Sequence, residues 1–414
     1  MRDRNSQSKA HTDAMSQDIA ELSADTATDP VAIAQALIRC PSVTPEEGGA
    51  LTWLKDLLTA HGFTAEIVRF SEEGTEDVDN LFAKIGSGAP HLTFAGHTDV
   101  VPPGDADRWT HPPFAAEIDE ETLYGRGAVD MKGAVACFVA AALDFLKTDG
   151  PPKGTLSFLI TGDEEGVSIN GTRKLLAWAK ERGEQFDHAI VGEPTNPDAL
   201  GDMIKIGRRG SLSGTVTITG VQGHAAYPHR ANNPTRGLEK VLSAFYAAPL
   251  DAGTPEFDPS TFEVTSVDTG NPAFNVIPAE VTINFNSRFN NLHTGDSLKA
   301  RIEKQVAAAL EGTGLSGRVA FVPNAAESFL TDVDEIAALL SETIQTETGR
   351  TPAYSTSGGT SDARYIKDYC PVVEFGLVGQ TMHQVDEQVD LADLKALTAI
   401  YRSFLPRYFD RFGG

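Results

Sequence analysis

Residues 155–165 read TLSFLITGDEE, an uncharged and largely apolar run that ends in three adjacent carboxylates. Such a run is typical of a strand covered on both faces, as strands are in an α/β sheet. Binding sites in these sheets lie outside the carboxyl ends of the strands. Adjacent carboxylates repel one another and are costly to bury unpaired, so Asp163, Glu164 and Glu165 either form a solvated turn or face cations. The stretch predicts an α/β sheet with a polar site at this edge.

Two other expected strands end in a similar way. His97 and Asp99 follow the strand expected at residues 91–95, and Glu193 follows the strand expected at residues 189–191. Residues two apart in an extended segment face the same side, so His97 and Asp99 can point into one site. Taken alone, each of these side chains also fits a surface loop. Their common place at strand ends favours one shared site.

Two further segments carry side chains that can bind a metal. Asp130 lies between the glycine-rich residues 125–127 and a helix expected at residues 133–146, where it also fits a helix N-cap. His383 lies in a late polar segment and indicates little by itself. Together the segments offer two histidines and several carboxylates without a cysteine. Such a set suits two borderline metal ions that share a bridging carboxylate and activate water for hydrolysis.

The pattern of elements divides the chain into one α/β domain and an insertion. Strands alternate with helices up to residue 209, which predicts a mixed, largely parallel sheet. Near Gly210 the pattern becomes strand, helix, strand, strand, helix, strand, which is typical of a ferredoxin-like α+β module. We expect a disordered extension over residues 1–28. An α/β catalytic domain follows in two parts, residues 29–209 and 323–414, and an inserted α+β domain lies between them at residues 210–322.

Composition and charge exclude several classes of protein. The net charge of −24 disfavours nucleic acid and anionic membranes as partners. The apolar runs are short and interrupted, so we expect no membrane-spanning helix. The three cysteines are odd in number and widely spaced, which argues against a disulfide framework and for the reducing cytoplasm.

Longer motifs carry a resemblance to a known family. Residues 96–102, 125–133 and 163–165 resemble the co-catalytic zinc amidohydrolases and peptidases of the aminoacylase/carboxypeptidase clan. Within that clan the chain is most similar to the succinyl-diaminopimelate desuccinylases. The resemblance runs from about residue 30 to the C-terminus, and the segments that decide it are residues 207–212, 223–229, 275–278, 286–289 and 357–364.

The resemblance implies a role for each metal-binding side chain. It implies two Zn²⁺ per subunit, one of them replaceable by Co²⁺ or Mn²⁺. One zinc is held by His97 and Glu193 and the other by Glu165 and His383. Asp130 bridges the two ions, and the peptide bond that follows it is cis.

The resemblance also implies the residues that act beside the metals. Asp99 holds the ring of His97, as carboxylates around metal sites commonly do. Glu164 is the general base and later the general acid. His224, on the inserted domain, reaches the site of the partner subunit and binds the tetrahedral oxyanion. The inserted domain is thus a dimerisation domain, and the chain is a homodimer.

Charge favours an anionic substrate, and the resemblance implies a small dicarboxylic acyl-amino acid. Two divalent ions and three carboxylate ligands leave a net charge of about +1 before Glu164 is counted. The planar forks of Arg208 and Arg288 suit substrate carboxylates, and the alternative for each is a surface ion pair, which is less favoured for Arg288 than for Arg208. The loop over residues 357–361 can present backbone N–H groups to a carboxylate, or it is a flexible connector. The expected substrate-binding residues are Arg208, Asn275, Arg288, Gly359 and Thr360.

The expected reaction is hydrolysis of the amide of N-succinyl-LL-2,6-diaminopimelate to succinate and LL-2,6-diaminopimelate, in lysine biosynthesis. Two alternatives stay open. One is an acetylornithine deacetylase or a related hydrolase of acyl-amino acids or dipeptides, because the metal residues do not separate these substrates. The other is a catalytically inactive binding protein of the same fold.

Overall fold

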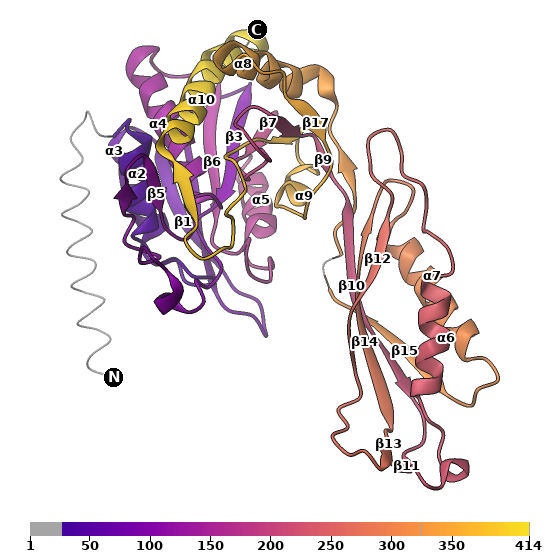
Figure 1. The fold of residues 1–414 in the computed structure, drawn as a ribbon. Helices are drawn as coiled ribbons and strands as arrows, with labels where there is room; N and C mark the ends of the chain where they lie inside the picture. The colour runs from indigo at the N-terminus through magenta and orange to yellow at the C-terminus, as the bar shows by residue number, and fades with distance from the viewer. Residues whose placement is uncertain (1–26, 324, 414) are drawn as a thin grey trace. The chain divides into compact units, whose positions relative to one another are not determined.

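The structure is a computed structural model that describes residues 27–323 and 325–413 (Figure 1). The described chain forms two compact units. Unit 1 comprises residues 27–206, 331–354 and 361–413, and unit 2 comprises residues 207–323, 325–330 and 355–360. No helix of the described ranges combines the length and apolarity needed to cross a membrane.

A mixed sheet forms the centre of unit 1, with strand order β1-β2-β6-β3-β7-β18-β8-β17. Its four central strands are parallel, and antiparallel strands flank them on both sides. The expected mixed, largely parallel sheet is therefore confirmed at its centre. The strands are β1 (Thr64–Phe70), β2 (Val78–Gly86), β6 (Thr155–Thr161), β3 (His91–His97), β7 (His188–Val191), β18 (Val372–Glu374), β8 (Met203–Lys205) and β17 (Ala353–Ser355).

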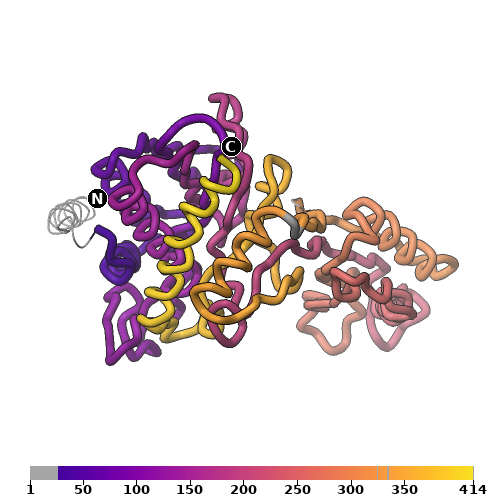
Figure 2. The backbone as a smooth tube through the Cα atoms, turned by 90° about the horizontal axis from the view of Figure 1, so that it is seen from above, coloured from indigo at the N-terminus to yellow at the C-terminus, as the bar shows by residue number. Residues whose placement is uncertain are grey.

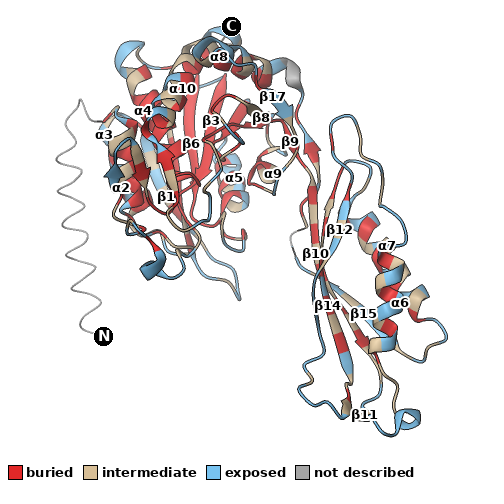
Figure 3. Ribbon diagram, viewed as in Figure 1, coloured by how far each residue is buried: buried red, intermediate tan, exposed pale blue. Residues whose placement is uncertain are grey.

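Helices cover both faces of this sheet because both faces of its strands are apolar. On β6, Leu156, Phe158 and Ile160 join the main hydrophobic core with helices α2 (Pro30–Ile38), α3 (Ala50–Ala60), α4 (Lys132–Thr148), α8 (Ala338–Thr348) and α10 (Leu391–Phe412). Alternate residues face the other way. Leu159 pairs with Phe82 of β2. The Phe82 ring packs edge-on against the ring of Trp178 of α5 (Thr172–Glu181), with centroids 5.7 Å apart. Figure 3 shows β3 and β6 buried along their whole length.

Helix α4 is buried almost all round, and small residues make this possible. A Cβ at Gly133 would lie 2.3 Å from the Ala128 carbonyl oxygen, so only glycine lets the helix start so close to the preceding loop. Farther along, the Phe138 ring stacks on Phe94 of β3 with centroids 4.2 Å apart. Helix α10, drawn in yellow in Figure 2, packs beside α4.

An irregular turn precedes helix α8. The backbone leaves helical geometry at Glu335 (φ −112°, ψ −105°), within the short turn Val333–Ala337 that precedes α8. The last helix, α10, continues past Pro406 to Phe412.

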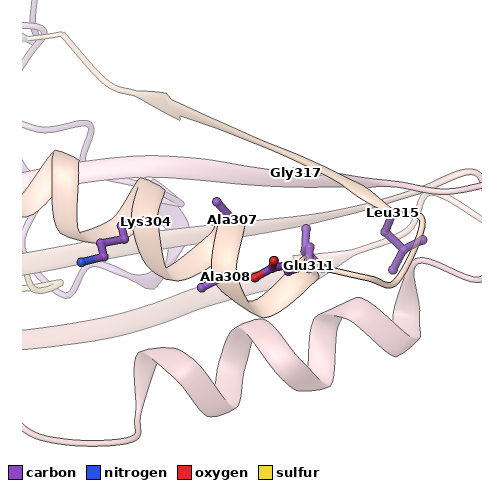
Figure 4. Close-up of a pocket in the computed structure, with 7 residues that line it drawn as sticks. Lys304, Ala307, Ala308, Glu311, Leu315 and Gly317 are labelled. Carbon is purple, nitrogen blue, oxygen red and sulfur yellow. The ribbon is translucent and has the colours of Figure 1, made fainter.

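Unit 2 has the strand order β12-β14-β10-β15, and its pairings are antiparallel. In chain order this is the expected ferredoxin-like arrangement, and it buries one sheet face against two helices. The elements are β10 (Gly210–Thr219), α6 (Thr235–Phe245), β12 (Thr261–Asp268), β14 (Glu280–Phe289), α7 (Gly295–Leu310) and β15 (Ser316–Phe321). A depression of about 580 Å³ lies at the end of α7, beside Leu315 and Gly317, and contains none of the candidate site residues (Figure 4).

The boundaries of unit 2 differ from the expected insertion over residues 210–322. Strands β9 (Gly207–Arg208) and β16 (Phe329–Leu330) pair with each other and lengthen unit 2 at both ends. Residues 355–360, expected in the second part of the catalytic domain, also belong to unit 2. The expected disordered extension over residues 1–28 lies mostly outside the described residues, but Ala27 is buried in the core of unit 1.

Candidate metal centre

Three loops of unit 1 meet because their strands are neighbours in the sheet. β3 lies between β6 and β7, and the three strands are parallel. The register pairs His97, the last residue of β3, with Thr161, the last residue of β6. The loop after β6 therefore brings Glu164 and Glu165 beside His97, and the loop after β7 brings Glu193. These loops leave the carboxyl edge of the sheet, where sites of this fold class form.

Asp130 stands between two histidine–glutamate pairs. Its Oδ1 lies 3.1 Å from His97 Nε2, and this nitrogen is 3.9 Å from Glu193 Oε1. Its Oδ2 lies 3.3 Å from His383 Nε2, and that nitrogen is 2.8 Å from Glu165 Oε1. One carboxylate thus presents one oxygen to each histidine, and the Asp130–Met131 peptide bond is cis, as expected.

The ligand atoms of the cluster are close enough to hold cations. Atoms of His97, Asp130 and Glu165 all lie within 4.8 Å of one another, and so do atoms of His97, Glu164 and Glu193. Imidazole and carboxylate donors without thiolates suit zinc and neighbouring divalent metals. The geometry adds Glu164 to the residues that can reach a metal.

The two halves of the cluster differ in exposure. The side chains of His97 and Glu193 are 1% and 11% exposed. On the other side of Asp130, the His383 side chain is 46% exposed, although that of Glu165 is 10% exposed. One position is therefore enclosed by the protein, and the other opens to solvent through His383.

Burial makes the carboxylates of the cluster difficult to ionise together. It is the main cause that raises the pKa of Glu164 and of Glu193 well above the usual range, and the charge of Asp130 adds to both effects. Burial acts on the Asp130 carboxylate in the same direction, but hydrogen bonds from His383 and His97 outweigh it and lower its pKa. Added positive charge stabilises ionised carboxylates, so the electrostatics of the cluster fit bound cations.

Asp99 contacts His97 differently from the expectation. The His97 Nδ1 lies 2.9 Å from the Asp99 carbonyl oxygen and 3.6 Å from its carboxylate. The carboxylate instead accepts hydrogen bonds from the backbone N–H groups of Glu164 and Glu165, at 3.3 and 3.0 Å. Asp99 thus orients the ring through its main chain and holds the acidic loop with its side chain. Burial raises the pKa of the Asp99 carboxyl to about 6, although His97 opposes this.

The first carboxylate of the acidic stretch has a structural role. Asp163 accepts hydrogen bonds from the backbone N–H groups of Ser168, Ile169 and Asn170, at 3.1, 2.8 and 2.9 Å. It closes the loop that follows β6. Glu164 and Glu165 are thereby left to supply the acidic side chains of the cluster.

Two expected residues of unit 2 lie next to each other on a short ribbon. His224 of β11 (Gly223–His224) pairs with Val276 of β13 (Val276–Ile277), and the Ala225 N–H donates to the Asn275 carbonyl oxygen. The His224 ring is exposed, and its Nδ1 accepts the Ala226 N–H at 3.1 Å. In the neutral imidazole the proton is therefore on Nε2, which can donate to a ligand.

The other expected substrate-binding residues also lie in unit 2. Arg208 is buried, and its Nη1 donates to the carbonyl oxygens of Ser357 and Gly359 at 3.4 and 3.2 Å. Arg208 thus orders the loop that carries Gly359 and Thr360. Arg288 lies half-buried on β14, opposite Ser211.

Two residues beside the metal cluster were not selected from the sequence. Glu387 and Arg126 form a buried ion pair at 2.7 Å, next to the backbone of Asp130 and His383. Glu387 stands four residues after His383 in a polar segment, and Arg126 in a glycine-rich loop. Neither position carries a periodicity or spacing that separates it from a surface charge.

Comparisons with known proteins show the family to which the chain belongs. The model of peptidase family M20/M25/M40 matches residues 93–407. A curated protein named succinyl-diaminopimelate desuccinylase, from Rhodopseudomonas palustris (strain BisB5), is 59% identical over 382 residues, which cover 92% of this chain and 98% of that protein.

Solved structures of the same family share the fold at low identity. An M20 metallo-carboxypeptidase from Sulfolobus solfataricus has a TM-score of 0.74 at 18% identity and covers 92% of this chain and 99% of its own. A dinuclear-metal-binding M20 peptidase from Bacillus subtilis has a TM-score of 0.67 at 16% identity, with coverage of 92% and 97%. The expected α/β fold with an inserted domain is confirmed, and the chain belongs to peptidase family M20/M25/M40.

Proposed function

We propose that the chain hydrolyses the amide of N-succinyl-LL-2,6-diaminopimelate, releasing succinate and LL-2,6-diaminopimelate for lysine biosynthesis. The observation that carries the proposal is Asp130, whose two oxygens face two separate histidine–glutamate pairs. The substrate follows from the name of the curated relatives, which are similar over 92% of the chain.

The metal-binding residues we propose are those of the two pairs and their bridge. His97 and Glu193 would hold one Zn²⁺, Glu165 and His383 would hold the other, and Asp130 would bind both. Co²⁺ or Mn²⁺ can take the place of one Zn²⁺. When bound, such ions polarise the substrate carbonyl and lower the pKa of water. The raised pKa values of Glu164 and Glu193 support this assignment, because a bound cation stabilises the ionised form that burial and the charge of Asp130 disfavour.

Glu164 is the proposed general base and acid. Its carboxylate lies within the same small group as His97 and Glu193, so it reaches the place where water is activated. Its backbone N–H is fixed by Asp99. A carboxyl whose pKa is raised by burial can accept a proton from water and later return it to the leaving amine.

His224 is the proposed oxyanion donor, and it would act in the site of the partner subunit. The Ala226 N–H occupies Nδ1, so the neutral ring presents Nε2–H without needing a second proton. A donor aimed at the developing negative charge stabilises the transition state more than the substrate. This role requires a homodimer formed through unit 2.

The ends of the substrate would be held by polar groups of unit 2. Arg208 and Arg288 carry the positive charge, and Asn275, Gly359 and Thr360 supply further hydrogen bonds. The bonds from Arg208 to Ser357 and Gly359 support a preordered loop for a carboxylate.

The three cysteines are buried and free, which fits the proposed cytoplasmic location.

A comparison of substrates tests the proposal. The zinc-loaded protein should hydrolyse N-succinyl-LL-2,6-diaminopimelate with a kcat/KM at least about 100-fold above that for N-acetylornithine, because a site built for a charged carboxylate discriminates strongly against an acyl group that lacks it. Preference for N-acetylornithine or for a dipeptide would move the chain to the alternative hydrolases. Zinc binding without turnover of any of these substrates would indicate a binding protein.

A further inference from the structure

We propose that Glu387 is a positioning residue that holds the bridging Asp130 and, through Arg126, the His383 loop in one fixed arrangement, so that the solvent-exposed metal position can fill. This inference deepens the proposed function and rests on the two-metal site described there. Glu387 and Arg126 have no part in the proposed reaction steps.

The Glu387 carboxylate is saturated by donors from the Asp130 loop. Its Oε1 accepts the backbone N–H groups of Val129 and Asp130, at 2.9 and 3.2 Å. Its Oε2 accepts the Gly127 N–H at 3.1 Å and Arg126 Nη1 at 2.7 Å. Three of the last four residues up to Asp130 thus bind one carboxylate through their main chains. This fixes the backbone from which the bridging side chain projects.

Arg126 extends the same network to the other ligand loop. Its Nη2 lies 3.4 Å from the His383 carbonyl oxygen, while Nη1 binds Glu387. The Arg126 guanidinium also lies over the Trp109 ring, 5.2 Å from its centroid. A planar fork can serve two acceptors in fixed directions, which a lysine cannot.

The strand ladder beside the site explains why these loops meet. β5 (Thr122–Tyr124) pairs antiparallel with β19 (Gln388–Asp390), with Tyr124 opposite Gln388. The chain therefore leaves β5 into the Asp130 loop at the point where it enters β19 from the His383 loop. The Gly125 N–H donates to the Glu387 carbonyl oxygen at 2.9 Å and continues this ladder.

The network touches the two halves of the metal cluster unequally. It holds Asp130 and, through a carbonyl oxygen, His383, and the side chain of His383 is 46% exposed. His97 and Glu193 are set by the ends of β3 and β7 and by the Asp99 carbonyl, which are independent of Glu387. Loss of the network should therefore weaken the exposed metal position, which uses both Asp130 and His383, more than the enclosed one, which shares only the Asp130 bridge.

A burial argument separates this role from a surface ion pair. The side chains of Arg126 and Glu387 are 3% and 0% exposed. A buried pair gives little net stability compared with apolar residues of the same size, because desolvation offsets the attraction. A pair kept beside two metal-binding loops is better explained by the geometry that it imposes.

Zinc titration of metal-free protein, without substrate, tests the inference. We expect wild type to bind two ions per chain. Glu387→Gln should bind the first ion within a few-fold of wild-type affinity and the second at least about 10-fold more weakly, as is typical when a group that orients ligands is removed. Its activity should need correspondingly more zinc, with kcat at saturating zinc within a few-fold of wild type.

Two further variants make the titration decisive. Glu184→Gln removes a partly buried glutamate paired with Lys84, far from the cluster; it should lower stability without changing either zinc affinity. Arg126→Lys keeps the charge beside Glu387 but loses the second bond to His383, so it should also weaken the second ion and provides a test if Glu387→Gln does not fold.

Three outcomes decide between the inference and the function on which it rests. Wild-type binding of both ions by Glu387→Gln and Arg126→Lys would overturn the inference. Two-ion binding by wild type without desuccinylation would overturn the proposed function and leave the inference standing. A wild-type chain that binds only one ion would overturn both.

Discussion

At the scale of single residues, the cluster assigns different tasks to chemically identical side chains. Asp163 closes a loop with its carboxylate, while Glu164 and Glu165 enter the metal cluster. Asp99 binds two backbone N–H groups, while Asp130 faces two histidines. The donors around each carboxylate, rather than its pKa in water, decide its task.

Glu164→Gln separates proton transfer from metal binding. The amide keeps the size of the side chain but cannot accept the proton, so kcat should fall by about 10²–10⁴-fold. The variant should still bind two zinc ions, measured by metal analysis of the purified protein, because none of the proposed metal ligands is changed. Near-native turnover with both ions bound would remove Glu164 from the role of base.

His91 should make stability depend on pH, far from the metals. It starts β3, is 3% exposed, and its Nε2 lies 2.8 Å from Ser157 Oγ. Burial lowers its pKa from 6.5 to about 4 in the folded chain, and attraction to Glu184 offsets this only in part. Between these values the unfolded chain binds a proton that the folded chain does not, so stability falls as pH falls.

The size of this effect can be measured by urea unfolding at two pH values. Between pH 7 and pH 5, His91 should remove about 2 kcal/mol from the free energy of unfolding. His91→Gln should lose less stability than wild type over the same interval, by about that amount. Equal losses in the two proteins would show that His91 does not titrate as its burial indicates.

At the scale of elements, the start of α4 decides where Asp130 can stand. A Cβ added at Gly133 would lie 2.3 Å from the Ala128 carbonyl oxygen and 2.7 Å from Leu377 Cδ1. Alanine is the better helix former by about 1 kcal/mol, but a backbone contact of this kind cannot relax cheaply. The clash therefore outweighs the gain in helix propensity.

Gly133→Ala should accordingly lower the free energy of unfolding by about 1–3 kcal/mol. It should also weaken zinc binding, because the displaced Ala128 belongs to the Asp130 loop. Thermal unfolding of the metal-free protein measures the first effect, with Gly359→Ala as a control, since an added Cβ there meets nothing within 4 Å. If Gly133→Ala is as stable as wild type, the Asp130 loop can move away from the added Cβ without loss of stability.

At the scale of the whole molecule, the proposed exchange of His224 between subunits can be tested by mixing. His224→Ala and Glu164→Gln chains should each be nearly inactive. Random reassociation places both native groups in one site of each mixed dimer, so about a quarter of wild-type activity should return. A tag on one chain verifies that mixed dimers have formed. If these dimers stay inactive, His224 does not act in the partner's site.

The sequence itself determined three central strands of unit 1, β3, β6 and β7, and the residues that follow them. Uncharged runs such as residues 155–161 are long enough to be recognised locally, and parallel strands bring their carboxyl ends to one edge. The candidate ligands His97, Glu165 and Glu193 could therefore be selected without coordinates. Asp130 and His383 were candidates from their residue types alone, but no strand leads into either, so their places in the cluster came from the family resemblance.

Tertiary packing decided what no local pattern carries. The Asp99 carboxylate, 3.6 Å from the His97 ring nitrogen, also binds the acidic loop, because parallel pairing places the backbone of Glu164 and Glu165 beside it. Glu387 and Arg126 became visible only through contacts with residues more than 250 positions apart in the chain. Hydrogen-bond partners of a buried charge depend on which loops the sheet brings together, and local sequence does not encode that meeting.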